Sequence, residues 1–243
     1  KETMLAEKYS AEALELYFDQ LCERFVAWAG QEAAHRLTRD SALTELAFPH
    51  AEFRPGQRHL AETVYKAALS ARHLMAQAPT GIGKTVATIF PLLKASPGQK
   101  IDKIFFLAAK TSGRSLALDA IDLIREGRDQ QAPVLPLRVL ELVARDKACE
   151  HPDKACHGES CPLAQGFYDR VAAARQAAVH AGALDQQALR TIALAHQVCP
   201  YYLSQELVRW SDIVVGDYNY YFDVSAMLYG LTVENDWRVA VLV

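Results

Sequence analysis

The stretch Ala78-Pro79-Thr80-Gly81-Ile82-Gly83-Lys84-Thr85 decides how this chain is interpreted. It follows the short apolar run 73–76 and precedes the apolar segment 86–90, so a strand, a glycine-bearing loop and a helix are expected in that order. Glycines let backbone N–H groups approach a polyphosphate, and the start of the helix adds free donors. We expect Lys84 to reach the outer phosphates and the Thr85 hydroxyl to ligate Mg²⁺. The alternative is an ordinary glycine-rich turn before a helix, which the Gly-x-Gly-Lys-Thr pattern disfavours.

Length, charge and composition set the broad class of the protein. The 243 residues allow one large domain or a domain with an insert, and 51% of them are hydrophobic, which is enough for a core. The net charge of −3 is small, so a nucleic-acid surface would have to be a local basic stripe. No apolar run reaches the length of a membrane span, and no signal-peptide core is present, so we expect no membrane partner. A start at Lys1, without Met, suggests a piece of a longer protein.

Hydrophobic periodicity predicts alternating helices and strands. Apolar residues recur at helical spacing over 11–36, which we interpret as a helix packed against the main domain. A connector follows to residue 50, and Pro97-Gly98 is expected to form a turn. Further helices are expected at 60–69, 85–94 (with Pro91 inside), 116–124, 167–180, 185–197 and 201–210. Further strands are expected at 103–109, 135–143, 213–215 and 237–243.

Gln57, just upstream of the loop, is a candidate reader of adenine. An amide donates and accepts at once, which matches the one donor and one acceptor on the adenine edge. Arg54 lies three residues earlier in Phe53-Arg54-Pro55-Gly56-Gln57. A solvent-facing residue at a helix start is the competing interpretation of Gln57.

The cysteine distribution indicates a metal site. Of five cysteines, Cys22 lies alone, and we interpret it as a core residue. Cys149, Cys156, Cys161 and Cys199 fall in one stretch that is otherwise poor in aliphatic residues. Four thiolates suit Zn²⁺ or a [4Fe–4S] cluster. The absence of Cys-x-x-Cys knuckles and the two Cys-Pro steps favour iron–sulfur modestly over zinc.

In their order, these motifs resemble an iron–sulfur superfamily 2 DNA helicase of the XPD/DinG/FANCJ group. Residues 53–57 resemble the adenine-reading motif, 78–85 motif I, and 109–112 motif Ia. The cysteines fall between motifs Ia and II, where this family places its cluster. The segments 199–203, 211–215 and 217–220 are similar to the exit from the family's cluster domain. The final strand, 239–243, looks like the one that precedes Asp-Glu-Ala-His in the family.

The resemblance implies an α/β fold, a RecA-like P-loop NTPase sheet with a small helical cluster insertion and an N-terminal helical extension. The expected parts are the extension at 1–50, the first motor domain at 51–143, the cluster insertion at 144–210 and the return to the motor domain at 211–243. The second motor domain and the acids of motif II are not in the sequence, so this piece is expected to be inactive by itself. A cytoplasmic, bacterial nucleoid-associated location is expected.

The implied activity is ATP-dependent unwinding of DNA, 5′→3′, with single-stranded or forked DNA and the remaining helicase domains as partners. The implied cofactors are ATP, Mg²⁺ and a [4Fe–4S] cluster, with zinc as the alternative. ATP contacts are expected from Arg54, Gln57, Thr80, Gly81, Ile82, Gly83, Lys84 and Thr85. DNA contacts are expected from Lys110, Thr111, Arg114 and Tyr218, with Lys147, Lys154, Arg170 and Arg175 as further candidates.

Three alternatives stay open at this point. One is a P-loop ATPase with a zinc insert that acts on a substrate other than DNA. Another is a non-enzymatic nucleic-acid binding module with a degenerate nucleotide site. For Tyr218 and Tyr220, packing beside the sheet competes with stacking on bases and is the preferred interpretation.

Overall fold

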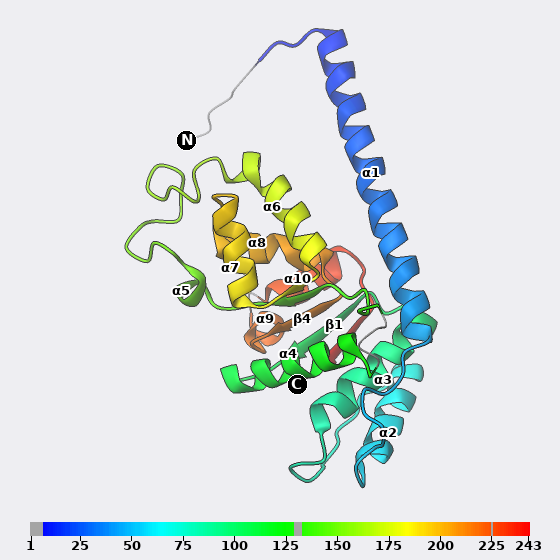
Figure 1. The fold of residues 1–243 in the computed structure, drawn as a ribbon. Helices are drawn as coiled ribbons and strands as arrows, with labels where there is room; N and C mark the ends of the chain where they lie inside the picture. Colours follow the sequence, from blue (N-terminus) through cyan, green and yellow to red (C-terminus); the bar gives the residue numbers. More distant parts are fainter. Residues whose placement is uncertain (1–6, 129–132, 225) are drawn as a thin grey trace.

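The computed structural model describes residues 7–128, 133–224 and 226–243, and its centre is a parallel β-sheet (Figure 1). The five strands run in the order β3-β2-β4-β1-β5, and every described pairing is parallel. Crossover helices cover both faces, as parallel sheets require. The prediction of an α/β fold is confirmed. The strands are β1 (Lys103–Leu107), β2 (Val139–Glu141), β3 (Ala183–Leu184), β4 (Ile213–Gly216) and β5 (Val239–Leu242).

Helices make up most of the rest of the described chain. None of them is long and apolar enough to cross a bilayer. They are α1 (Ala11–Thr44), α2 (Gln57–Leu69), α3 (Lys84–Gln99), α4 (Thr111–Glu126), α5 (Arg145–Ala148), α6 (Phe167–Ala181), α7 (Gln186–Ala195), α8 (Pro200–Leu207), the 3₁₀ helix η1 (Val208–Trp210), α9 (Asn219–Phe222) and α10 (Met227–Glu234).

The sheet divides the hydrophobic core into two layers. Ile104 of β1 belongs to the layer that includes residues of α2, α3, α4 and the end of α1. The next residue, Phe105, belongs to the layer that includes residues of α6, α7, α8 and α10. Successive side chains of a strand point to opposite faces, so one continuous apolar strand supplies both layers. This explains the uninterrupted apolar run in the sequence.

The run 73–76 forms no strand, which corrects one expectation. Met75 is fully exposed and Leu74 is 40% exposed. Among the described residues, β5 pairs only with β1, so its other edge offers free backbone groups while 73–76 stays unpaired. The phosphate-loop candidate is therefore preceded by extended chain without sheet hydrogen bonds.

Other boundaries differ in ways that follow from backbone chemistry. Helix α3 runs through Pro91 and Pro97, so the predicted turn at Pro97-Gly98 is wrong. Proline removes one N–H donor, but its fixed φ is compatible with helical backbone. Strand β2 is shorter than predicted, and β3, α9 and α10 were not predicted. The two-residue β3 and the four-residue α9 are too short to give a periodic signal.

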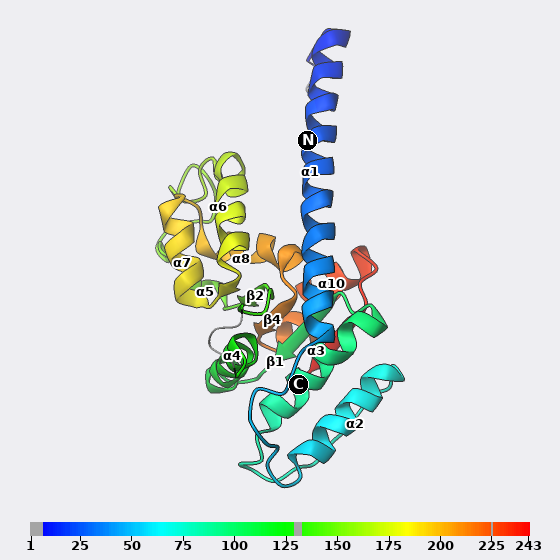
Figure 2. The ribbon, with the colours of Figure 1, turned by 45° about the vertical axis from the view of Figure 1, so that its right-hand side comes forward.

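Helix α1 differs most from the prediction, both in length and in packing. It continues to Thr44, eight residues beyond the expected end, and buries only Arg39 and Leu43. Its N-terminal part projects away from the body (Figures 1 and 2). Phe18 is 64% exposed and Phe25 is 63% exposed. The expectation that this apolar segment packs against the main domain is therefore wrong for the N-terminal part.

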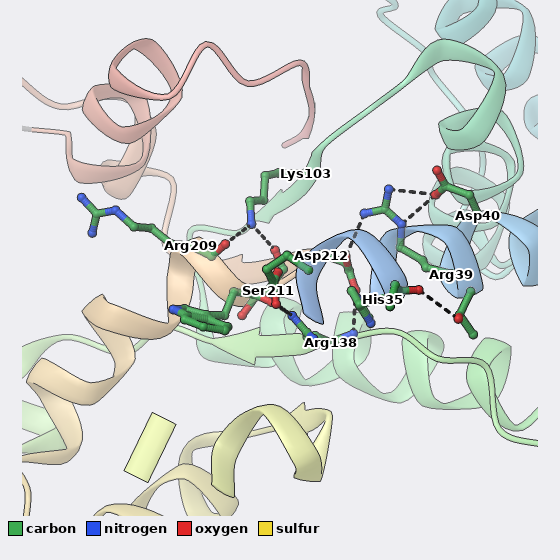
Figure 3. A network of polar contacts seen from close by, with 12 residues as sticks. His35, Arg39, Asp40, Lys103, Arg138, Arg209, Ser211 and Asp212 are labelled. Atoms are coloured by element: carbon green, nitrogen blue, oxygen red, sulfur yellow. Dashed lines mark hydrogen bonds and ion pairs between the residues drawn. The ribbon is translucent and has the colours of Figure 1, made fainter. Parts of the chain in front are cut away.

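A buried polar network fixes the C-terminal part of α1 to the sheet (Figure 3). Asp212, just before β4, lies 2.9 Å from the His35 ring and 2.8 Å from the Arg39 guanidinium. Its carboxylate also accepts the backbone N–H of Arg138 at 2.8 Å. Burial alone would raise the pKa of Asp212, but the hydrogen bond with His35 and the charge of Arg39 outweigh it and lower the pKa to about 2. Each of its bonds joins elements that lie far apart in the sequence.

Burial acts in the opposite direction on the pKa of a lysine near this network, because for a base the charged form is the protonated one. Burial lowers the pKa of Lys103 to about 8, although the nearby Asp212 favours the charged form. Its ammonium donates to the carbonyls of Arg209 and Ser211, each at 2.7 Å, and lies over the Trp237 ring. These contacts satisfy a charge that the sheet has removed from water.

Candidate nucleotide and nucleic-acid site

The predicted phosphate loop has a backbone that only glycine adopts easily. Gly81 and Gly83 have φ of 85° and 81°, in the left-handed region. A Cβ at Gly83 would also overlap Nε2 of Gln57, so this position is restricted twice. Helix α3 begins at Lys84, directly after this bend. The free N–H groups at its start therefore face the loop, as an anion site requires.

Gln57 braces this loop through both ends of its amide. Its Oε1 accepts the backbone N–H of Arg54 at 3.0 Å, and its Nε2 donates to the Gly83 carbonyl at 3.2 Å. The residue is 1% exposed. In this arrangement one donor and one acceptor of the amide are used in hydrogen bonds within the protein. A direct contact with adenine would need the remaining donor or a rearrangement, so the adenine role stays a prediction.

Arg54 adds a second brace. Its Nη1 donates to the Gly81 carbonyl at 2.7 Å, so the two residues from one short turn hold both glycines. Pattern matching suggested contact with the base, whereas the structure shows contact with the loop backbone. A bracing role was not predicted because backbone carbonyls leave no trace in a sequence.

Lys84 and Thr85 lie where a phosphate-loop interpretation requires them. Lys84 is exposed, and its ammonium donates to the carbonyls of Ala78 and Pro79 at 3.2 and 3.0 Å. The lysine therefore folds back over its own loop. Thr80 and Ile82 complete the loop, with Thr80 exposed. The donor set of loop amides, ammonium and the Thr85 hydroxyl fits a polyphosphate with Mg²⁺.

A cavity of about 540 Å³ joins the loop to the carboxyl edge of the sheet. Thr85, Gly113, Tyr218 and Val243 all line it, although they come from four separate segments. Ligands of open α/β sheets bind at this edge. Tyr218 is 41% exposed there. Tyr220 instead is half-buried and donates its hydroxyl to the Val143 carbonyl at 2.9 Å, so the packing interpretation describes Tyr220.

The predicted DNA contacts divide into exposed and buried residues. Lys110 and Thr111 are exposed at the start of α4. Arg114 is only 6% exposed, and its guanidinium lies 3.4 Å from the Glu141 carboxylate. Because the Glu141 carboxylate of β2 is buried beside its guanidinium, Arg114 can hold α4 against β2. An unpaired buried charge would be costly, which explains the pairing.

Three of the four predicted metal ligands, Cys149, Cys161 and Cys199, lie near the start of α8. Cys199 precedes that helix, and burial raises the pKa of its thiol, with Cys149 and Cys161 near enough to raise it further. The Arg145 guanidinium lies 3.9 Å from Sγ of Cys156. Within the described ranges, no group of three or more His, Cys, Asp or Glu side chains is close enough to hold a metal ion. The described structure therefore does not test the predicted four-thiolate site.

Two of the basic residues beside the cysteines, Arg170 and Arg175, already interact with other groups of the protein. Arg170 donates to the carbonyls of Pro162, Gln165 and Gln197, so it ties the cysteine loop to the region before α8. Arg175 pairs with Glu206 and lies over the Trp210 ring. Lys147 and Lys154 are exposed.

Family comparison gives this geometry a context. Residues 137–236 match the DEAD_2 family model, which spans β2, the cysteine region and the return to the sheet. A regulator of telomere elongation helicase 1 homolog from Anopheles gambiae is 32% identical over 113 residues. A second such homolog, from Culex quinquefasciatus, is 28% identical over 103 residues.

The extent of these similarities is limited. The alignments cover 41% and 37% of this chain, and the chain spans about a tenth of the length of these relatives, 11% and 10%. A structure described as XPD_Helicase has a TM-score of 0.48 at 16% identity and covers 79% of this chain and 32% of its own. One described as Truncated XPD has a TM-score of 0.44 at 20% identity, covering 70% of this chain and 47% of its own.

Proposed function

We propose that this chain is the nucleotide-binding part of an ATP-dependent DNA helicase that moves 5′→3′ on single-stranded or forked DNA. One observation carries the proposal: a preformed phosphate loop lies at the edge of a parallel sheet whose later strands match the DEAD_2 model. An ATPase that acts on a protein would leave the DEAD_2 match unexplained, and nucleic-acid binding without ATP would leave the phosphate loop unused.

In the proposed mechanism, the phosphate-loop residues position the nucleotide and neutralise its charge. Phosphoryl transfer depends on orientation and neutralisation more than on covalent chemistry. In the proposal, the Lys84 ammonium leaves the carbonyls of Ala78 and Pro79 and neutralises the outer phosphates. The loop amides hold the phosphate oxygens, and the Thr85 hydroxyl contributes a ligand to Mg²⁺. Gln57 and Arg54 keep Gly81 and Gly83 in the orientation that presents those amides.

The decisive substitution is Lys84→Ala in the intact protein that carries this chain. We expect ATP hydrolysis stimulated by single-stranded DNA to fall by at least about 100-fold, because a preorganised charge that stabilises the transition state is removed. Unwinding of a forked duplex should be lost with it. Lys66→Ala, an exposed lysine of α2, is the matched control and should leave both rates unchanged. Unwinding that survives Lys84→Ala would refute the proposal.

We also propose a [4Fe–4S] cluster at Cys149, Cys156, Cys161 and Cys199. The proximity of Cys149 and Cys161 to Cys199 supports a thiolate site, and the few aliphatic residues between 146 and 165 mean that this loop needs support from outside its own side chains. When bound, the cluster would link the segments that carry the four cysteines through its iron–thiolate bonds. Zinc is the competing metal, since it accepts the same four ligands.

A further inference from the structure

A single buried carboxylate, that of Glu141, joins two helices that belong to different layers of the core. Glu141 is the last residue of β2 and is 8% exposed. Its Oε1 lies 3.4 Å from Nε of Arg114 in α4. Its Oε2 accepts the backbone N–H of Gln186, the first residue of α7, at 3.0 Å. Because α4 packs in one layer and α7 in the other, this side chain links the two layers at the end of a strand.

Both contacts suit a carboxylate that has been removed from water. The Arg114 guanidinium supplies the opposite charge, and the start of α7 supplies the positive end of the helix dipole. The Asp185 side chain already caps this helix by accepting the N–H of Ala188 at 2.7 Å, so Glu141 is an additional acceptor there. A buried charge that loses one partner is strongly destabilising. The contacts of Glu141 with α4 and with α7 therefore depend on each other.

On its α4 side, the link reaches the cavity of about 540 Å³. Gly113 and Leu116, which lie one residue before and two residues after Arg114, both line this cavity. Nη2 of Arg114 also donates to the Thr111 hydroxyl at 3.2 Å, in the first turn of α4. The ion pair with Glu141 therefore fixes the helical turn that forms one wall of the cavity.

On its α7 side, the link reaches the chain around Cys149. The side-chain amide of Gln186 donates to the Lys147 carbonyl at 2.9 Å. One turn farther along α7, Arg190 binds the Glu150 carboxylate through two N–H groups. Lys147 and Glu150 lie on either side of Cys149 in the sequence. Helix α7 therefore holds the chain both before and after this cysteine.

The structure assigns Glu141 the role of a positioning residue that sets the chain around Cys149 relative to the cavity wall formed by α4. An unbroken series of direct contacts carries the assignment, from Arg114 through Glu141 and Gln186 to the residues beside Cys149. Energetic coupling along such a series is measured by combining substitutions. No nucleotide or metal takes part in these contacts, so the role of Glu141 is independent of the proposed helicase activity.

Hydrogen exchange of the 243-residue chain, followed by mass spectrometry, tests this role. In Arg114→Gln we expect the amides of 147–150 to exchange at least about tenfold faster, because Glu141 loses its cationic partner and leaves its buried position. The double variant Arg114→Gln/Glu141→Gln should return to within about threefold of the unsubstituted chain, because a neutral amide pair replaces the ion pair. Arg36→Gln, which breaks an ion pair with Asp102 elsewhere in the body, is the control and should leave these amides unchanged. Faster exchange confined to α4, or no recovery in the double variant, overturns the assignment.

A substitution at the start of α7 tests the same link without a change of charge. Proline is well tolerated at the first helical position, and Asp185 already has the extended backbone that suits a following proline. Gln186→Pro therefore removes the N–H that Glu141 accepts and keeps α7 in place. Gln186→Ala is the matched control, because it removes the same side chain and keeps the N–H.

The two variants at position 186 are compared at the far end of the link, in α4. We expect the amides of Gly113 and Arg114 to exchange about fivefold faster in Gln186→Pro than in Gln186→Ala, from the loss of about one net hydrogen bond. Equal exchange of these amides in the two variants would contradict a link through Glu141.

Discussion

The phosphate loop and the cysteine loop both lack regular structure, yet they are held in different ways. The phosphate loop is braced by Gln57 and Arg54, which bond directly to the carbonyls of its glycines. The cysteine loop has Arg170 as a tie, and its thiols lie near one another without forming a ligand set. The difference teaches that side chains from another part of the fold can fix a loop backbone without a ligand, whereas the proposed cysteine site would need its metal to bring the four thiols together.

Replacing one thiol should have the largest effect on this contrast. We expect Cys161→Ser to remove the bound iron and acid-labile sulfide almost completely and to open 149–161 to limited proteolysis, since a three-thiolate set is incomplete. Visible absorbance, iron content and the cleavage pattern are the measurements. Cys22→Ser, far from the loop, is the matched control. Stoichiometric zinc in a colourless unsubstituted protein would replace the iron–sulfur proposal, and a loop that stays protected in Cys161→Ser would remove the contrast.

Breaking the phosphate loop should have the next largest effect. Gly83→Ala forces a Cβ into the left-handed region and against the Gln57 amide. We expect affinity for ATP to fall by about 100-fold in the intact protein, because the misdirected amides lose several charge-assisted hydrogen bonds. Titration with a fluorescent ATP analogue measures this. Gly30→Ala is the control, because Gly30 is helical and an added Cβ there would meet no neighbouring side chain within 4 Å. Unchanged affinity would show that the brace does not define the loop.

Weakening the brace should have the smallest effect. Gln57→Ala removes two hydrogen bonds and keeps the loop sequence, so we expect about a tenfold loss of ATP affinity, from about 1 kcal/mol per buried hydrogen bond partly offset by relaxation. Comparison of ATP with GTP in the same titration separates the roles. A loss confined to ATP would assign the amide to adenine, and an equal loss for both would assign it to the brace.

The sequence was sufficient for features that depend on local chemistry. The parallel α/β fold followed from continuous apolar strands such as 103–107, and the loop geometry followed from glycines at 81 and 83. The exposure of apolar residues such as Phe18 and Phe25 on α1 was not predictable, because periodicity indicates that a face is apolar and not whether anything covers it. The absence of a strand at 73–76 was not predictable either, because a strand forms only where its backbone pairs with a neighbouring strand, and local sequence does not show this pairing.

Long-range polar contacts were also beyond prediction. Nothing in the sequence links His35 and Arg39 to Asp212, because charged residues separated by more than 170 positions carry no periodic signal. Arg114 likewise matched a DNA-contact pattern, whereas its burial beside Glu141 became visible only in three dimensions. Its buried pairing favours a structural role over a contact with DNA.

The Asp212 network makes separation of α1 from the sheet costly. The Asp212 carboxylate, only 10% exposed, binds both His35 and Arg39 of α1. Lifting α1 off the body would remove both partners at once, and a mostly buried charge that loses its partners is strongly destabilising. The position of the long helix is therefore tied to the start of β4.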